Sequence, residues 1–142
     1  MGLGDVYKRQ HPSVFAKTTP NTPAYIMTDT GETVTYLDLE KRSNKVAHLF
    51  HNAGLKRHEH VAMMMENHVR FFEIIWGALR SGVIITPIST ALLDEEVAYI
   101  LNNCEAKLFI TTPKYTSIAR SALKVNNIDH FFMVGDLSLI HI

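Results

Sequence analysis

Histidines are the residues of this sequence whose spacing comes closest to that of a metal site. The chain contains eight, and His48 and His51 stand three residues apart, with His58 and His60 following closely. Such a group could hold zinc or iron, since imidazole is a common ligand of both metals. On the helix predicted here, however, His48 and His51 lie beside the apolar stripe rather than within it. We interpret these histidines as polar surface residues.

Acidic residues and a cysteine offer two further kinds of chemistry. Asp94, Glu95 and Glu96 are adjacent carboxylates, and paired carboxylates can act as general acid and base. They also fall at a predicted helix start, where negative charge is stabilising. Cys104 could act as a nucleophile, but it falls on the apolar face of its helix. We expect a capping role for the acidic run and core packing for the thiol.

Motifs that bind phosphate or build a hydrolase site are missing from the sequence. Gly-x-x-x-x-Gly-Lys-Ser/Thr, Gly-x-Gly-x-x-Gly at a strand–helix junction, and Gly-x-Ser-x-Gly do not occur. The segment 111–114 (Thr-Thr-Pro-Lys) faintly resembles a phosphate loop but has no glycine to let backbone approach phosphate. Phe71, Phe72 and Trp76 could line an acyl pocket, although their helical spacing favours core packing. We assign no catalytic, cofactor-binding or metal-binding residue.

Composition is that of an ordinary globular domain. Of 142 residues, 46% are hydrophobic, and fourteen basic residues balance fourteen acidic ones. This balance argues against a nucleic-acid partner. The single cysteine excludes an intramolecular disulfide, and charged residues interrupt every apolar run before the length needed to span a bilayer. We expect a cytoplasmic protein with no transmembrane segment.

The first half of the chain predicts a short helix, a hairpin and a long helix. Residues 11–17 favour a helix, and two strands at 24–27 and 33–36 flank a turn composition at 29–31. Thr35 is an N-cap candidate, with Asp38 three residues later as in a capping box. The helix that follows places Leu39, Val46 and Phe50 on one stripe and ends at Gly54.

From residue 60 onward, strands alternate with helices. The strands are expected at 60–65, 83–87, 107–111 and 130–134, and both 60–65 and 83–87 read as buried. The intervening helices have apolar faces formed by Phe71, Ile74, Ile75, Ala78 and Leu79; by Val97, Ile100, Leu101 and Cys104; and by Tyr115, Ile118, Ala119, Ala122 and Leu123. Asn67, Asp94 and Thr112 are the expected caps. The fold class is α/β, a layered, mostly parallel sheet flanked by helices.

The two ends of the chain differ from its middle. Residues 1–10 show no periodicity, and residues 137–142 form a short apolar tail. We interpret both as non-native or disordered segments flanking a domain at 11–136, which would be cut from a longer gene. The alternative is a frayed arm at the N-terminus and an edge strand at the C-terminus.

Six short motifs, taken in order, resemble those of the adenylate-forming enzymes. Thr33-Val-Thr-Tyr-Leu-Asp-Leu39 resembles their first core motif, and Ala78-Leu-Arg-Ser-Gly-Val-Ile-Ile-Thr-Pro87 resembles their second, with Gly82 allowing tight helix–strand packing. The remaining matches are segments 20–25, 43–47 with 54–55, 61–67, and 95–101 with 106–110. They resemble most closely the fatty-acyl or related carboxylic-acid CoA ligases.

The resemblance implies the N-terminal portion of the large adenylating domain of an acyl-CoA synthetase. Such an enzyme joins a carboxylic or fatty acid to AMP, using ATP and Mg²⁺, and then transfers the acyl group to coenzyme A. The family's phosphate loop has no counterpart in the sequence, so the resemblance implies that the chain alone is inactive. One alternative is a non-catalytic α/β module that binds a partner. A flavodoxin- or receiver-like domain would need an acidic cluster at a strand end, where only Glu66 stands.

Overall fold

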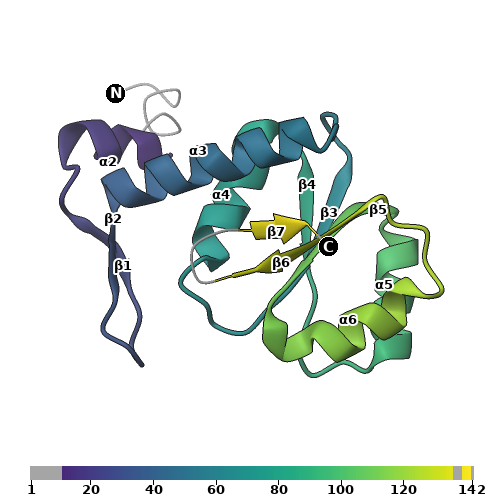
Figure 1. The fold of residues 1–142 in the computed structure, drawn as a ribbon. Coiled ribbons are helices and arrows are strands. Elements are labelled where there is room, and N and C mark those ends of the chain that lie inside the picture. The colour runs from purple at the N-terminus through teal and green to yellow at the C-terminus, as the bar shows by residue number, and fades with distance from the viewer. Residues whose placement is uncertain (1–10, 136–138, 142) are drawn as a thin grey trace.

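A five-stranded sheet forms the centre of the molecule. The computed structural model describes residues 11–135 and 139–141. The strand order is β4-β3-β5-β6-β7, and all neighbours are parallel except β6 and β7 (Figure 1). The strands are β3 (His60–Met64), β4 (Ile84–Pro87), β5 (Ala106–Thr111), β6 (His130–Val134) and β7 (Leu139–His141). The expected α/β class with a mostly parallel sheet is confirmed.

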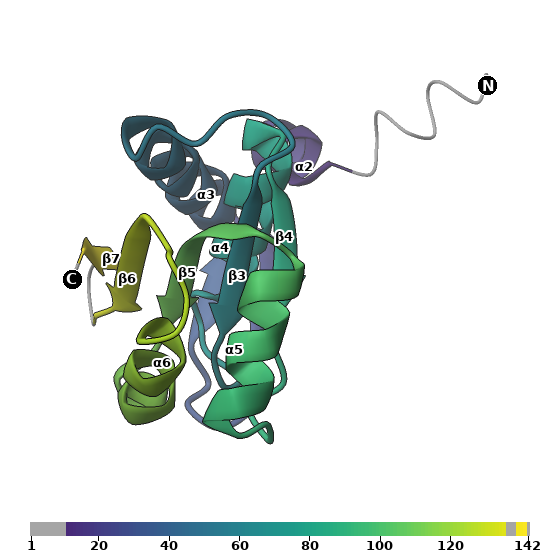
Figure 2. The same cartoon turned by 90° about the vertical axis from the view of Figure 1, so that its right-hand side faces the viewer.

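Helices cover both faces of this sheet. On one face lie α3 (Tyr36–Asn52) and α4 (Phe71–Ser81), and on the other lie α5 (Asp94–Asn103) and α6 (Thr116–Leu123), as Figure 2 shows. A short 3₁₀ turn, η1 (Pro113–Tyr115), precedes α6. The two faces have separate cores, one including Phe50, Ile74 and Val61 and the other including Val97 and Phe109. This is the layered arrangement that buries apolar residues on both sides of a parallel sheet.

The N-terminal elements stand beside the sheet. Helix α2 (Pro12–Thr18) leads into a two-stranded hairpin, β1 (Pro23–Ile26) and β2 (Thr33–Thr35), which stays separate from the main sheet. The expected capping box is present, because Thr35 Oγ1 accepts from the Asp38 N–H at 3.1 Å and Asp38 accepts from the Thr35 N–H at 3.2 Å. Beyond α3, Gly54 has a φ of +81°, as a glycine after a helix end should.

Burial differs from the sequence prediction at two places. Strand β3 is central, and Val61 to Met64 are all buried, as predicted. Strand β4, expected to be buried, lies at the sheet edge, and Ile84 is 43% exposed. Leu79, predicted on the apolar face of α4, is 55% exposed, whereas Ile74 and Ala78 of the same helix are fully buried.

Two expected helix caps are replaced by other arrangements, and the third residue is at the cap position without a side-chain cap bond. Asn67 lies four residues before α4, whose N-cap position is Arg70 with no side-chain cap. Asp94 is the first residue of α5 rather than its cap, and Glu96 instead accepts from the Leu93 N–H at 2.9 Å. Thr112 occupies the cap position of η1, but its side chain bonds elsewhere.

Close packing between helices occurs at Gly77 rather than at Gly82. A Cβ on Gly77 would lie 2.5 Å from Val46 Cγ1, so the glycine lets α4 approach α3. Gly82 has a φ of +72°, and a Cβ there would meet only the flexible side chain of Arg57 at 3.0 Å. Gly82 is therefore needed for the left-handed end of α4, which corrects the packing role expected of it.

The C-terminal tail contains the edge strand that was the alternative to a disordered tail. Leu139–His141 pair antiparallel with Val134–Phe132 of β6. Residues 1–10, 136–138 and 142 lie outside the described residues, so the expected arm at 1–10 is not placed. The domain boundaries at 11 and 136, and the interpretation of both ends as non-native segments, stay predictions.

Candidate functional site

The chain adds its next strands on opposite sides of β3, so the strand order reverses there. In an open α/β sheet, such a point is the usual position of a binding crevice. From β3 the chain moves to β4 on one side and then crosses to β5 on the other, with α4 and α5 on opposite faces. Ligands in such folds bind outside the carboxyl ends of the strands at this switch point. The residues there are Glu66 and Asn67 after β3, and Thr111 and Thr112 at the end of β5.

Hydrogen bonds join the two strand ends at this point. The Thr112 hydroxyl donates to Glu66 Oε2 at 2.6 Å, and the Thr111 hydroxyl donates to the Met64 carbonyl at 2.9 Å. Both threonines are buried. The sequence analysis did not pair Glu66 with Thr112. The signal was available, since residues that directly follow neighbouring parallel strands meet at the same sheet edge.

The described residues at this crevice do not fit the phosphates of ATP. Both threonine hydroxyls donate to partners within the protein. Lys114 Nζ lies 5.5 Å from the centroid of the Tyr115 ring, and η1 is a single turn. A phosphate loop needs free backbone N–H groups at glycines, and segment 111–114 contains no glycine. We derive no chemical step from this segment.

A buried carboxylate lies in the first turn of α4. Glu73 is 2% exposed, and Arg70 Nη1 lies 3.1 Å from its Oε1. Arg42 Nη1 of α3 lies 4.0 Å from Glu73 Oε2 and 4.0 Å from Glu32 Oε1 in the hairpin. Burial raises the pKa of Glu73, and the two arginines oppose that shift. The group links the hairpin, α3 and α4, so its arrangement is that of a structural clamp.

A second polar clamp joins α3 to the end of α4. Arg80 donates to both carboxylate oxygens of Glu40, at 2.7 and 3.2 Å, and to Asn44 Oδ1 at 2.5 Å. The hydrogen bond from Arg80 lowers the pKa of Glu40. Neither clamp was predicted. Arg80 and Glu40 are forty positions apart, so no local pattern pairs them, whereas Arg70 and Glu73 are only three apart and could have been paired from the sequence.

The aromatic residues of α4 are less buried than expected. Phe72, predicted to pack in the core, is 46% exposed and lines two adjacent cavities of about 240 and 250 Å³. Tyr25 from the hairpin packs on Phe72 with ring centroids 5.1 Å apart. The Tyr25 hydroxyl donates to the Val69 carbonyl at 2.6 Å, and burial raises its pKa to about 12. Trp76 lines one cavity and contacts His11 edge-on at 5.1 Å. These contacts fasten the hairpin and α2 to α4.

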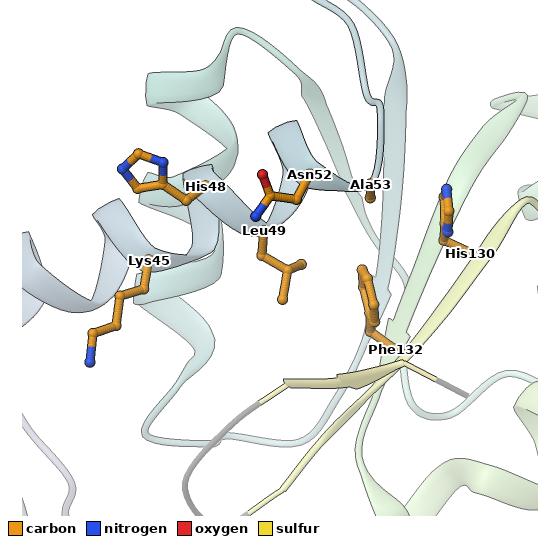
Figure 3. A pocket seen from close by; sticks show the side chains of 7 residues that line it. All are labelled: Lys45, His48, Leu49, Asn52, Ala53, His130 and Phe132. Atoms are coloured by element: carbon orange, nitrogen blue, oxygen red, sulfur yellow. The ribbon is translucent and has the colours of Figure 1, made fainter.

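An open groove lies between α3 and β6. Its volume is about 500 Å³, within the range of ligand pockets. It is lined by Lys45, His48, Leu49, Asn52, Ala53, His130 and Phe132. Figure 3 shows the Leu49 and Phe132 side chains directed into the space between the helix and the strand. The floor is apolar and the rim is polar. We call this cavity the α3–β6 groove.

The residues first considered for chemistry are not brought together. His48, His51 and His58 are exposed, and the described residues contain no group of three or more His, Cys, Asp or Glu that could hold a metal. Asp94 accepts a hydrogen bond from the Ser121 hydroxyl, which lowers its pKa. Cys104 is half-buried at the C-cap of α5, with its Sγ 3.7 Å from the Leu101 carbonyl.

Comparison with protein families shows which family the chain belongs to. The AMP-binding enzyme family matches residues 13–135. The chain belongs to this family. The resemblance to adenylate-forming enzymes, which rested on six short motifs, is thereby confirmed. No described helix is long and apolar enough to cross a membrane.

Curated relatives of this AMP-binding family member are CoA ligases. The crotonobetaine/carnitine–CoA ligase of Proteus mirabilis is 33% identical over 88 residues, which are 62% of this chain and 17% of that protein. The ligase of the same description from Salmonella paratyphi A is 30% identical over 103 residues, or 71% of this chain and 20% of that protein. The chain spans about a fifth of the length of these relatives.

Solved structures share the fold. A long-chain-fatty-acid CoA ligase from Rhodopseudomonas palustris superposes with a TM-score of 0.79 at 24% identity, covering 97% of this chain and 34% of that one. A benzoate CoA ligase from Burkholderia xenovorans gives a TM-score of 0.81 at 24% identity, covering 89% of this chain and 25% of that one. These matches cover the layered sheet and helices described above.

Proposed function

We propose that this chain is the N-terminal part of the adenylating domain of an AMP-forming acyl-CoA synthetase. The observation that carries the proposal is the family match over residues 13–135, together with curated relatives that are CoA ligases. The full enzyme would activate a carboxylic acid as acyl-AMP and pass the acyl group to coenzyme A. ATP, Mg²⁺ and coenzyme A would be its cofactors and substrates, and the cytoplasm its compartment.

Within such an enzyme, this segment would supply scaffold rather than reacting groups. Several of its polar side chains hydrogen-bond to one another: Thr112 to Glu66, Arg70 to Glu73 Oε1, and Arg80 to Glu40. Hydrogen bonds of this kind between protein groups stabilise the fold, although the second oxygen of Glu73, Oε2, is buried without a hydrogen-bond partner. The reacting groups would come from polypeptide outside this segment.

A hybrid enzyme tests the proposal. Residues 13–135 replace the corresponding segment of the Proteus mirabilis crotonobetaine/carnitine–CoA ligase, and acid-dependent AMP release and thioester formation with coenzyme A are measured. We expect an active hybrid, and no acid-dependent exchange of pyrophosphate into ATP by the isolated chain. A folded hybrid without thioester formation would contradict the ligase assignment, and exchange by the isolated chain would contradict the scaffold role.

A matched variant separates scaffold from chemistry in the same hybrid. Thr112→Val removes the hydroxyl at the switch point and keeps the side-chain shape. We expect the hybrid carrying it to unfold at lower temperature but to keep its kcat per folded molecule. A large loss of kcat in the folded variant would place Thr112 in the reacting machinery instead.

A further inference from the structure

Helix α2 begins at a histidine that caps it through its ring. His11 is the N-cap residue of α2, and its Nδ1 accepts a hydrogen bond from the Ser13 N–H at 3.2 Å. A backbone N–H can only donate, so Nδ1 must carry a lone pair and the ring must be neutral at this contact. The Ser13 hydroxyl oxygen lies 2.7 Å from the same nitrogen. A proton on Nδ1 could be donated to that hydroxyl, but it would abolish the cap bond from the N–H.

The surroundings of the His11 ring also favour its neutral form. Among the described residues, the charged groups that act on the ring are Arg80 of α4 and Glu40 of α3. Partial burial and the charge of Arg80 lower the pKa of His11 below its ordinary 6.5, and Glu40 opposes them. Both carboxylate oxygens of Glu40 already accept hydrogen bonds from Arg80. A cation at the first turn of a helix also faces the positive end of the helix dipole, and α2 has no acidic residue there to offset it.

His11 also joins the start of α2 to α4. Its ring meets the Trp76 ring edge-on, with the two centroids 5.1 Å apart. Further along α2, the Phe15 ring packs on Tyr36 at the start of α3, with centroids 5.0 Å apart. Helix α2 has only seven residues, and a helix this short is not stable without a cap and tertiary contacts. The attachment of its first turn to α4 therefore depends on the state of the His11 ring.

We propose that His11 is a pH-sensitive switch, whose protonation in mildly acidic solution releases the first turn of α2 from Trp76. The same step opens one wall of the cavity of about 240 Å³ that Pro12, Phe15 and Trp76 help to line. The attached state binds the proton less tightly than a free histidine does. Its stability is therefore complete above about pH 6.5 and is lost as pH falls through 6.5 and the lowered pKa of His11. The switch goes beyond the reaction proposed above and does not depend on it.

Trp76 is the only tryptophan of the 142-residue chain, so its fluorescence reports the switch directly. Emission is followed between about pH 5 and pH 8, the range in which histidine side chains titrate. We expect the emission of the full chain to move to longer wavelength as pH falls, with a midpoint below 6.5, because the half-buried indole becomes exposed to water. His11→Asn should abolish this shift, since asparagine caps a helix without titrating. His48→Asn is the matched control, because His48 is exposed on α3, and this variant should keep the shift.

Proton NMR of the unaltered chain tests the switch without any substitution. The His11 ring should titrate with a midpoint below 6.5, and the Ser13 amide resonance should move with the same midpoint as its N–H loses its acceptor. A His11 midpoint at or above 6.5, or a Ser13 amide that does not follow the ring, would overturn the proposal. An emission shift that persists in His11→Asn, or that disappears in His48→Asn, would do the same. Titration of His11 with no change in Trp76 emission would leave α2 attached and overturn its release.

Discussion

The hydroxyl of Thr112 donates a 2.6 Å hydrogen bond to the carboxylate of Glu66, joining the ends of two neighbouring parallel strands. The two residues are 46 positions apart in the chain. Thr112 directly follows β5, and Glu66 lies two residues after the end of β3. The bond ties the β3–α4 connection to the β5–η1 connection. It therefore holds together the part of the sheet where the direction of winding changes.

Loss of this hydrogen bond should destabilise the protein. Thr112→Val keeps the branched shape but removes the donor, so the buried site loses a hydrogen bond to a charged acceptor. We expect the free energy of unfolding to fall by about 1–3 kcal/mol, measured by urea denaturation. Thr116→Val is the control, since the Thr116 hydroxyl makes an exposed local bond to the Pro113 carbonyl and a long contact of 3.8 Å with Met133 Sδ. If both substitutions lowered the free energy of unfolding equally, the Thr112–Glu66 hydrogen bond would have no special stabilising role.

A residue larger than glycine at position 77 should destabilise the protein unless Val46 is replaced by a smaller residue. In Gly77→Ala the new Cβ meets Val46 Cγ1 at 2.5 Å and Val46 Cβ at 2.6 Å. Overpacking of this kind costs about 1–3 kcal/mol, although alanine gains helix propensity. We expect a lower thermal midpoint by circular dichroism. The double variant Gly77→Ala/Val46→Ala should be more stable than the sum of the single effects predicts, because the methyl group added at position 77 then has room. Additive effects would contradict close packing at this pair.

The sequence predicts the elements of this fold well because their signals are local. Thr35 and Asp38 are three residues apart, and the unbroken apolar run from Val61 to Met65 marks a central strand. The order of strands is not local. Strand β4 has the composition of a buried strand, but its place at the edge follows from the crossover to β5, which leaves Ile84 exposed.

The polar contacts were less predictable for the same reason. Arg80 meets Glu40, and Tyr25 meets the Val69 carbonyl, across about forty residues of sequence. Such pairs depend on how α3 and the hairpin sit against α4. Gly82 follows the apolar helical pattern, which predicts a helix end there, and its φ of +72° confirms it. The packing role of Gly77 follows only from the approach of Val46 on α3, which no local pattern indicates.

Arg80 should not be replaceable by lysine. Its guanidinium donates to both oxygens of Glu40 and to Asn44, a geometry that a single ammonium cannot reproduce. We expect Arg80→Lys to lower the free energy of unfolding by about 1–2 kcal/mol. Arg120→Lys, at an exposed position on α6, should change it by less than about 0.5 kcal/mol. The measurement is urea denaturation at neutral pH. If Arg80→Lys lowered the free energy of unfolding no more than Arg120→Lys does, the guanidinium hydrogen bonds to Glu40 and Asn44 would contribute nothing to stability.

Glu73 and Glu40 should give the protein opposite pH dependences. Burial raises the pKa of Glu73 above its ordinary 4.5, so the folded state holds this proton more tightly than the unfolded state. Stability contributed by Glu73 is therefore present at low pH and declines as pH rises from about 4.5 through the raised pKa. Compared with Glu73→Gln, the wild type should lose stability across that window. Glu40 has a lowered pKa because Arg80 donates to it, so its contribution is lost as pH falls below about 4.5. Urea denaturation between acidic and neutral pH measures both differences, and slopes of the same sign for Glu73→Gln and Glu40→Gln would contradict the assignment.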